Sequence, residues 1–308
     1  MSNKLQISVS PHIRCNRTTQ NIMLDVIIAL LPAAIAGVVI FGARAALVLA
    51  VCVAACVLSE FLFNLIVKKK QTVSDLSAVV TGLLLGLNLS SNVPLWQAVV
   101  GCVFAIIIVK CLFGGIGRNF VNPAITARVF MLVAFTELAQ SASPVDAVAG
   151  ATPLATLAES GTHPSLDKLL LGNYGGAIGE TCTLALIIGG VYLLCRRVIT
   201  WHIPTVFIGT VFVFTLLVNG FDVMNAAAWI MSGGLFIGAI FMATDYATSP
   251  ATPWGKVVFA VGAGLITCLI RFWGNYPEGT SFAILLMNIL TPYIEVWTAR
   301  KPFGGKIK

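Results

Sequence analysis

The chain has 308 residues, of which 58% are hydrophobic and only 10% charged, and its formal net charge is +7. Soluble domains carry about 25% charged residues, so this composition excludes an ordinary water-soluble protein and indicates one that faces lipid. The basic residues cluster between apolar runs and do not alternate with exposed aromatic residues, which argues against a nucleic-acid partner.

Ten apolar segments are expected to be membrane spans, because a helix needs about 20 apolar residues to cross about 30 Å of hydrocarbon. The polar first twenty residues are not followed by an apolar stretch with a cleavage site, so we expect no cleaved signal peptide. The third span is short, and Asp75 at its start, with Thr81 and Asn88 inside it, suits a protein interface better than lipid. The expected spans are 22–41, 44–67, 76–90, 96–114, 121–138, 178–195, 202–219, 226–243, 255–272 and 280–298.

A long connection, 139–177, separates an N-terminal membrane half, 1–138, from a C-terminal membrane half, 178–308. The Gly-containing run 81–86 in the first half is similar to the run 233–238 in the second. With five spans in each half, equivalent helices must point in opposite directions, which is the plan of an inverted repeat. We therefore predict an all-α polytopic membrane protein with two inverted five-helix repeats; the alternative is a chance similarity between Gly-rich apolar segments.

The distribution of Lys and Arg predicts the orientation. If the N-terminus is cytoplasmic, fifteen basic residues lie on the inner side, and only Arg44, Lys168 and Arg271 lie on the outer side. We therefore expect a multi-pass protein of the bacterial cell (inner) membrane, with both termini in the cytoplasm and the connection 139–177 outside.

Ionisable residues within the expected spans are costly in hydrocarbon, so each is a candidate for a functional role. Either they hold structural or interfacial positions, or they line an ion path. The eight cysteines form no C-x-x-C pair and the three histidines have no ligand spacing, so we expect no metal site. We also find no nucleotide-binding motif. The candidates within spans are Asp25, Glu60, Asp75, Arg128, Glu137, Glu180 and Glu295.

The connection between the halves contains the run Asp-Ala-Val-Ala-Gly-Ala-Thr at 146–152. The hydroxyl of Thr152 follows small residues, and Gly150 lets the backbone bend, so a modifying enzyme would have access to the hydroxyl. By composition alone, the same segment is also typical of a low-complexity linker.

The run 146–152 resembles the flavinylation motif recognised by bacterial flavin transferases, in which the phosphate of FMN is joined to the threonine hydroxyl. Three further segments, 77–89, 113–124 and 243–250, are similar to the D subunit of the Rnf electron-transport complex and to the B subunit of the Na+-pumping NADH:quinone reductase. The resemblance covers essentially the whole chain. The resemblance favours the Rnf subunit, because the quinone-reductase subunit has a longer N-terminal extension than this chain, whose first span begins near Ile22.

The resemblance implies a membrane subunit of a ferredoxin:NAD+ oxidoreductase, a redox-driven translocase that couples electron transfer to Na+ or H+ movement. It implies FMN covalently bound at Thr152, with Asp146, Gly150 and Ala151 completing the motif; Ala149 stands where serine is common. Thr152 is then an anchor and takes no part in acid–base catalysis. A second, noncovalent flavin (riboflavin or FMN) is also implied, although no residue places it.

The partners implied by the resemblance are the A, B, C, E and G subunits of the Rnf complex, a flavin transferase and membrane lipid. Two alternatives remain open at this stage. One is the B subunit of a Na+-pumping NADH:quinone reductase, and the other is an inverted-repeat transporter or channel without a redox role.

Overall fold

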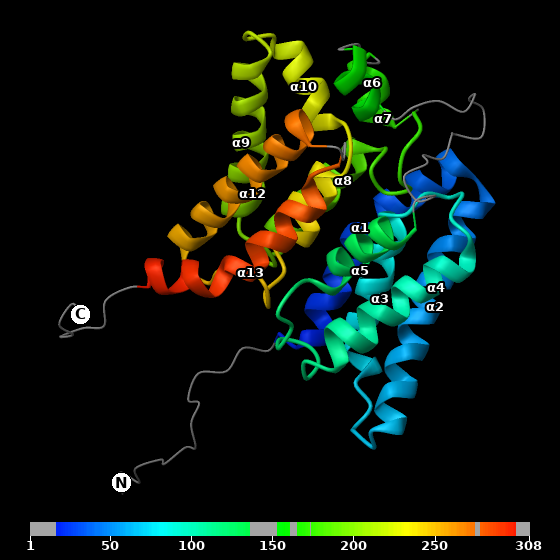
Figure 1. Cartoon of the computed structure of the whole chain (residues 1–308). Coiled ribbons are helices and arrows are strands. Elements are labelled where there is room, and N and C mark those ends of the chain that lie inside the picture. Colours follow the sequence, from blue (N-terminus) through cyan, green and yellow to red (C-terminus); the bar gives the residue numbers. More distant parts are fainter. Residues whose placement is uncertain (1–16, 136–152, 161–164, 173, 275–277, 300–308) are drawn as a thin grey trace, which may run out of the picture.

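The computed structural model of the chain is helical, with no strand among the residues that it describes. Figure 1 shows the helices as one bundle, with α6 and α7 at one end and the beginning of α1 toward the opposite end. The described residues are 17–135, 153–160, 165–172, 174–274 and 278–299.

The first half forms five apolar helical segments. The fourth of them, α4, continues without interruption into a π-helix, a form that is frequent at functional sites. The elements are α1 (Thr19–Phe41), α2 (Ala43–Ile66), the 3₁₀ helix η1 (Val73–Asp75), α3 (Ser77–Leu87), α4 (Leu95–Val103), the π-helix η2 (Phe104–Cys111) and α5 (Pro123–Ala134).

The second half also forms five segments, and it too contains a π-helix, here in its third segment. The elements are α8 (Thr183–Cys195), α9 (His202–Val218), α10 (Val223–Met231), α11 (Leu235–Ile237), the π-helix η4 (Gly238–Met242), α12 (Pro253–Trp273) and α13 (Thr280–Thr298).

Parts of the connection between the halves are helical, although the sequence suggested a loop. The two helices are α6 (Pro153–Ser160) and α7 (Leu166–Leu171). Leu154 and Leu157 of α6 are buried together with Leu169 of α7, Tyr174 and Trp229 of α10. This small apolar cluster attaches the described part of the connection to the second half.

The lengths of the helices support a multi-pass membrane protein. By length and apolarity, α1, α2, α12 and α13 are each able to cross a membrane, and α10 with Leu235–Met242 adds a fifth segment bent by 67°. Within the described residues, five shorter apolar helices bring the number of apolar segments to ten, as expected from the sequence: α3, Leu95–Cys111, α5, α8 and α9. The prediction of an all-α polytopic protein is thus confirmed.

The structure agrees with the predicted shortness of the third segment and departs from the predicted spans at the eighth. At 1.5 Å per residue, the eleven residues of α3 extend only about 17 Å, roughly half of the hydrocarbon core. The eighth segment was expected to be continuous over 226–243, but it breaks between α10 and α11. Both segments correspond to the Gly-containing runs that suggested the repeat.

The irregular backbone after α3 is buried, which is tolerated at membrane depth only where other protein groups satisfy it. The backbone N–H of Ile178 donates to the carbonyl of Leu89 at 3.0 Å, and that of Gly179 donates to Leu87 at 2.7 Å. A Cβ at Gly179 would lie 2.6 Å from the Cβ of Leu87, so only glycine allows this approach. The segment before α8 therefore closes the end of α3.

The two halves meet through equivalent helices. The first helices of each half, α1 and α8, pack against each other, and so do the fifth, α5 and α13. Within the halves, α2 packs against α3 and α4, while α9 packs against α10 and α12. This arrangement is the one expected of two inverted repeats related by a pseudo-two-fold axis.

Candidate functional site

The residues expected to form the FMN site lie outside the described residues; they are Thr152, Asp146, Gly150 and Ala151. Glu137 also lies outside the described residues. The described chain resumes at Pro153, the first residue of α6. Residue 152 is therefore joined directly to a helix N-terminus, where unpaired N–H groups and the helix dipole favour a phosphate. Proline is common at the first helical position. The FMN ester on Thr152 stays a prediction from the sequence.

Helix α6 lies beside a group of buried charged residues that come from both halves. A Cβ added to Gly233, which follows α10 with a φ of +72°, would lie 3.1 Å from Cδ2 of Leu154 and 3.3 Å from Nη2 of Arg271. Only Gly233 thus separates α6, the helix after the run 146–152, from the buried guanidinium of Arg271.

Arg128 is the centre of this group, which we call the arginine cluster: Arg128, Glu180, Arg271, Glu278 and Asn88. Arg128 belongs to α5 and is 5% exposed. Its Nη1 lies 2.7 Å from Oε1 of Glu180, and its guanidinium also contacts Glu278 and the side-chain oxygen of Asn88. Both carboxylates come from the second half, so Arg128 joins the two halves.

Each guanidinium of the arginine cluster faces a place where a helix breaks. Arg271 donates to the carbonyls of Trp229 at 2.8 Å and Ser232 at 3.1 Å, at the end of α10. Arg128 contacts Asn88, the residue that ends α3. Cations stabilise the C-terminal ends of helices, where carbonyl groups have no helical partner. Arg271 therefore supplies partners that the broken α10 lacks. Arg128 reaches the end of α3 through the side chain of Asn88, whose Nδ2 donates to the carbonyl of Leu84 at 2.6 Å.

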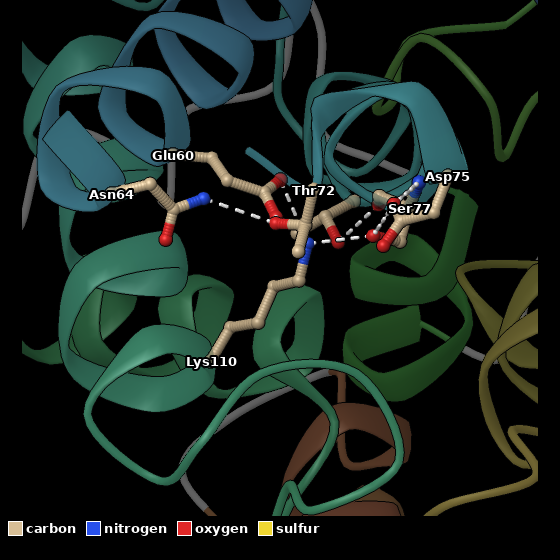
Figure 2. A network of polar contacts seen from close by, with 7 residues as sticks. Glu60, Asn64, Thr72, Asp75, Ser77 and Lys110 are labelled. Carbon is tan, nitrogen blue, oxygen red and sulfur yellow. Dashed lines mark hydrogen bonds and ion pairs between the residues drawn. The ribbon is translucent and has the colours of Figure 1, made fainter. Parts of the chain in front are cut away.

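A second polar network, which we call the lysine network, lies within the first half and is shown in Figure 2. Nζ of Lys110, on η2, lies 2.9 Å from Oε2 of Glu60 on α2, and donates to Oγ of Ser77 at 2.6 Å. Thr72 donates to Oε1 of Glu60 at 2.6 Å, and Ser77 donates to Asp75. Because Lys110 and Glu60 are each 2% exposed, each neutralises a charge that would otherwise be buried alone.

A cavity of about 90 Å³, lined by both apolar and polar side chains, lies between the halves, next to the lysine network. Lys110, Ser77 and Thr81 line it from the first half, and Thr244 and Asp245 line it from the second. The expectation that Thr81 suits a protein interface therefore agrees with the structure, and Asp245 lies at the same interface. Besides its apolar side chains, the lining includes hydroxyl, amide, ammonium and carboxyl groups, which are able to hold water.

Asp245 follows η4, in the segment before α12. Burial raises the pKa of its carboxyl above the ordinary value, whereas the backbone of Ala247 and the Thr248 hydroxyl partly offset the effect. The hydroxyl of Thr248 lies 3.2 Å from Oδ2. The group is thus held partly desolvated beside the cavity.

A third set of charges joins the halves near the start of α1. Nε of Arg196, directly after α8, lies 3.2 Å from Oδ1 of Asp25 on α1. The hydroxyl of Tyr192 donates to the same oxygen at 3.0 Å. Arg196 is more than half exposed, so this pair is closer to water than the arginine cluster.

Most of the ionisable residues that the sequence singled out have polar partners in the structure. Besides those described above, Glu295 accepts from the backbone N–H of Ala251 at 3.0 Å. Sequence reasoning did not single out Lys110, Arg271 and Glu278, because each lies near the expected end of a span. The long apolar runs that precede Lys110 and Arg271 were the available sequence signal that these two cations are buried. Among the described residues, no three His, Cys, Asp or Glu side chains are grouped as a metal would require.

The chain is similar to known proteins over nearly its entire length. The model of the family described as "NQR2, RnfD, RnfE family" matches residues 6–304. The D subunit of the Na(+)-translocating ferredoxin:NAD(+) oxidoreductase complex of Acetobacterium woodii is 49% identical, over 99% of this chain and 97% of the relative. The D subunit of the proton-translocating ferredoxin:NAD(+) oxidoreductase complex of Clostridium ljungdahlii is 41% identical, over 99% of this chain and 97% of the relative. The D subunit of the ion-translocating oxidoreductase complex of Stutzerimonas stutzeri is 37% identical, over 93% of this chain and 92% of the relative.

Proposed function

The chain belongs to the NQR2, RnfD, RnfE family, and from that premise we propose that it is the D-type membrane subunit of an ion-translocating ferredoxin:NAD+ oxidoreductase. The observation that carries the proposal is the 49% identity to a protein of that name, over 99% of this chain and 97% of the relative. The protein then acts within a redox-driven translocase, and its principal partners are the other subunits of the complex.

We further propose that Thr152 carries FMN through a phosphate ester. The motif 146–152 supports this assignment, and so does the helix that begins at Pro153, because its N-terminus favours a phosphate. When bound, FMN supplies a carrier that accepts and releases electrons singly. The contribution of this chain is to anchor the flavin on α6, which the cluster of Leu154, Leu157 and Trp229 attaches to the membrane helices. A second, noncovalent flavin remains an expectation of the resemblance.

The cavity between the halves is proposed as part of the path of the translocated cation. It lies where the short α3 meets the segment after η4, and Thr81, Thr244 and Asp245 are among its lining residues. Relatives named for Na+ and for protons are both similar to this chain along its whole length. A transport assay with either ion, on the purified complex in sealed vesicles, distinguishes the two cations.

We propose that the protein resides in the cytoplasmic (inner) membrane with both termini in the cytoplasm. Two observations support this orientation: the excess of Lys and Arg on one side of the expected spans, and the position of α6 and α7 at the end opposite to the start of α1 (Figure 1). Cysteines introduced at Ser143 and Ser160 should react with an impermeant reagent in right-side-out membrane vesicles. Reaction in inside-out vesicles alone would reverse the orientation.

The intact mass of the purified chain, coexpressed with its flavin transferase, tests the redox assignment. The expected result is the mass of the chain plus one phosphate-linked FMN, with a denatured band that fluoresces under ultraviolet light. An unmodified chain that still moves cations across a membrane by itself would favour the alternative, a transporter or channel without a redox role.

A further inference from the structure

An open apolar groove lies along α8 and α9 of the second half, and none of its lining residues belongs to the arginine cluster. We call it the α8–α9 groove. Its volume is about 560 Å³, within the range of about 300–1,000 Å³ that is typical of pockets for small ligands. Leu194 of α8, Ile199, and Pro204, Ile208 and Gly209 of α9 are among its lining residues. The groove is therefore an apolar recess at membrane depth.

One end of the α8–α9 groove adjoins a group of basic residues. Nζ of Lys256 lies 3.1 Å from the hydroxyl of Thr200, the residue after Ile199. Nη1 of Arg17 lies 3.5 Å from the carbonyl of Arg197, whose own side chain is exposed. None of these three cations takes part in an ion pair with a described acidic residue. An excess of positive charge is thus concentrated at this end.

The basic end also has the features of a membrane–water boundary. Trp201 is 59% exposed there, and tryptophan is enriched where the headgroups meet the hydrocarbon. From Pro204, next to this boundary, to Phe212, deeper in the groove, α9 rises about 12 Å. The groove therefore runs from the headgroup level into the hydrocarbon, with its charges at the headgroup end.

We propose that the α8–α9 groove binds an anionic phospholipid. The lipid phosphate lies against Lys256, Arg197 and Arg17, and one acyl chain occupies the apolar groove. Basic residues between transmembrane helices on the cytoplasmic side are suited to anionic headgroups. A membrane-spanning partner helix would fill the apolar part but would leave the three cations without counter-charges. The site is independent of the flavin and of the electron transfer proposed above.

Native mass spectrometry of the full chain in detergent, titrated with palmitoyl-oleoyl phosphatidylglycerol, tests the proposal. We expect one lipid bound in preference to phosphatidylcholine of the same chains. The double change Arg197→Gln with Lys256→Gln should weaken phosphatidylglycerol binding about 25-fold, or about fivefold for each cation removed, as for basic residues near a lipid surface. Lys168→Gln, a change of an exposed lysine in α7, is the charge control and should leave the affinity unchanged.

A second variant tests the apolar part of the site. A Cβ added to Gly209 meets no atom within 4 Å, so Gly209→Leu should leave the fold intact while its side chain enters the groove. It should reduce lipid binding at least tenfold, whereas Ala54→Leu, at an exposed position of α2, should not. Unchanged phosphatidylglycerol binding in both the charge and the groove variants would overturn the proposal. So would a Gly209→Leu complex that loses another subunit but retains the lipid.

Discussion

Arg128 on α5 and Glu180 before α8 are 52 positions apart in the sequence, and their Nη1 and Oε1 atoms lie 2.7 Å apart inside the bundle. Because they belong to different halves, this ion pair is a direct connection between the two repeats. Glu278 contacts the same guanidinium from the segment before α13. The connection lies beside α6, which follows the proposed flavin site.

Replacement of Arg128 by Met should destabilise the protein by about 3–5 kcal/mol, because it leaves a buried carboxylate without its partner. The measurement is the thermal unfolding of the purified protein in detergent. Arg118→Gln is the matched control, since Arg118 is exposed, and it should change stability by less than about 0.5 kcal/mol. If the two variants unfold at the same temperature, Arg128 does not stabilise the junction between the halves.

The Lys110–Glu60 pair should show strong coupling in a double-mutant cycle. Lys110→Met and Glu60→Gln should each destabilise the protein by about 3–5 kcal/mol, because each leaves the other charge buried and unpaired. The double variant should be more stable than the sum of the single effects predicts, by about 0.5–3 kcal/mol. Unfolding temperatures of the four proteins in one detergent provide the test, and strictly additive effects would show that the pair is not coupled.

Gly82→Ala should destabilise the packing of α3 against α2. A Cβ at this position would lie 2.8 Å from Cα of Val53 and 2.9 Å from the carbonyl oxygen of Cys52, and neither backbone atom is able to move aside easily. The expected cost is about 1–3 kcal/mol, as for other overpacked sites. Gly209→Ala is the control, because the added methyl group meets no neighbour. We expect that control to be neutral or slightly stabilising, since alanine favours a helix.

Thr152→Ala should abolish covalent FMN and the electron transfer of the complex. Because the change removes the hydroxyl that the ester needs and keeps a small side chain, the variant should still insert and assemble normally. Intact mass and in-gel fluorescence report the flavin. Thr156→Ala is the control and should retain FMN, because only Thr152 ends the Asp-x-x-Ala-Gly-Ala-Thr motif. A fluorescent Thr152→Ala chain with the added mass of FMN would show that another residue carries the flavin.

The sequence by itself determined the membrane architecture. The ten apolar segments follow from hydropathy and length alone. An apolar segment in lipid has no water to bond to, so it satisfies its backbone groups by forming a helix. The division into two sets of five and the flavinylation motif are also local properties, since both can be found by comparing short runs of residues. The family assignment rests on the same local patterns, and the whole-length match supports it.

Only the tertiary structure decided which charges are partners. Hydropathy identified Glu60 and Arg128 as costly residues, but it does not show that Lys110 and Glu180 neutralise them, because these contacts join residues 50 and 52 positions apart. The break between α10 and α11 was also missed, since an apolar run of sufficient length reads as a continuous span. The carbonyl of Ser232, which this break leaves without a helical partner, accepts a hydrogen bond from Arg271, 39 positions later in the sequence. Such pairing depends on how the helices pack, and a local sequence pattern does not contain that information.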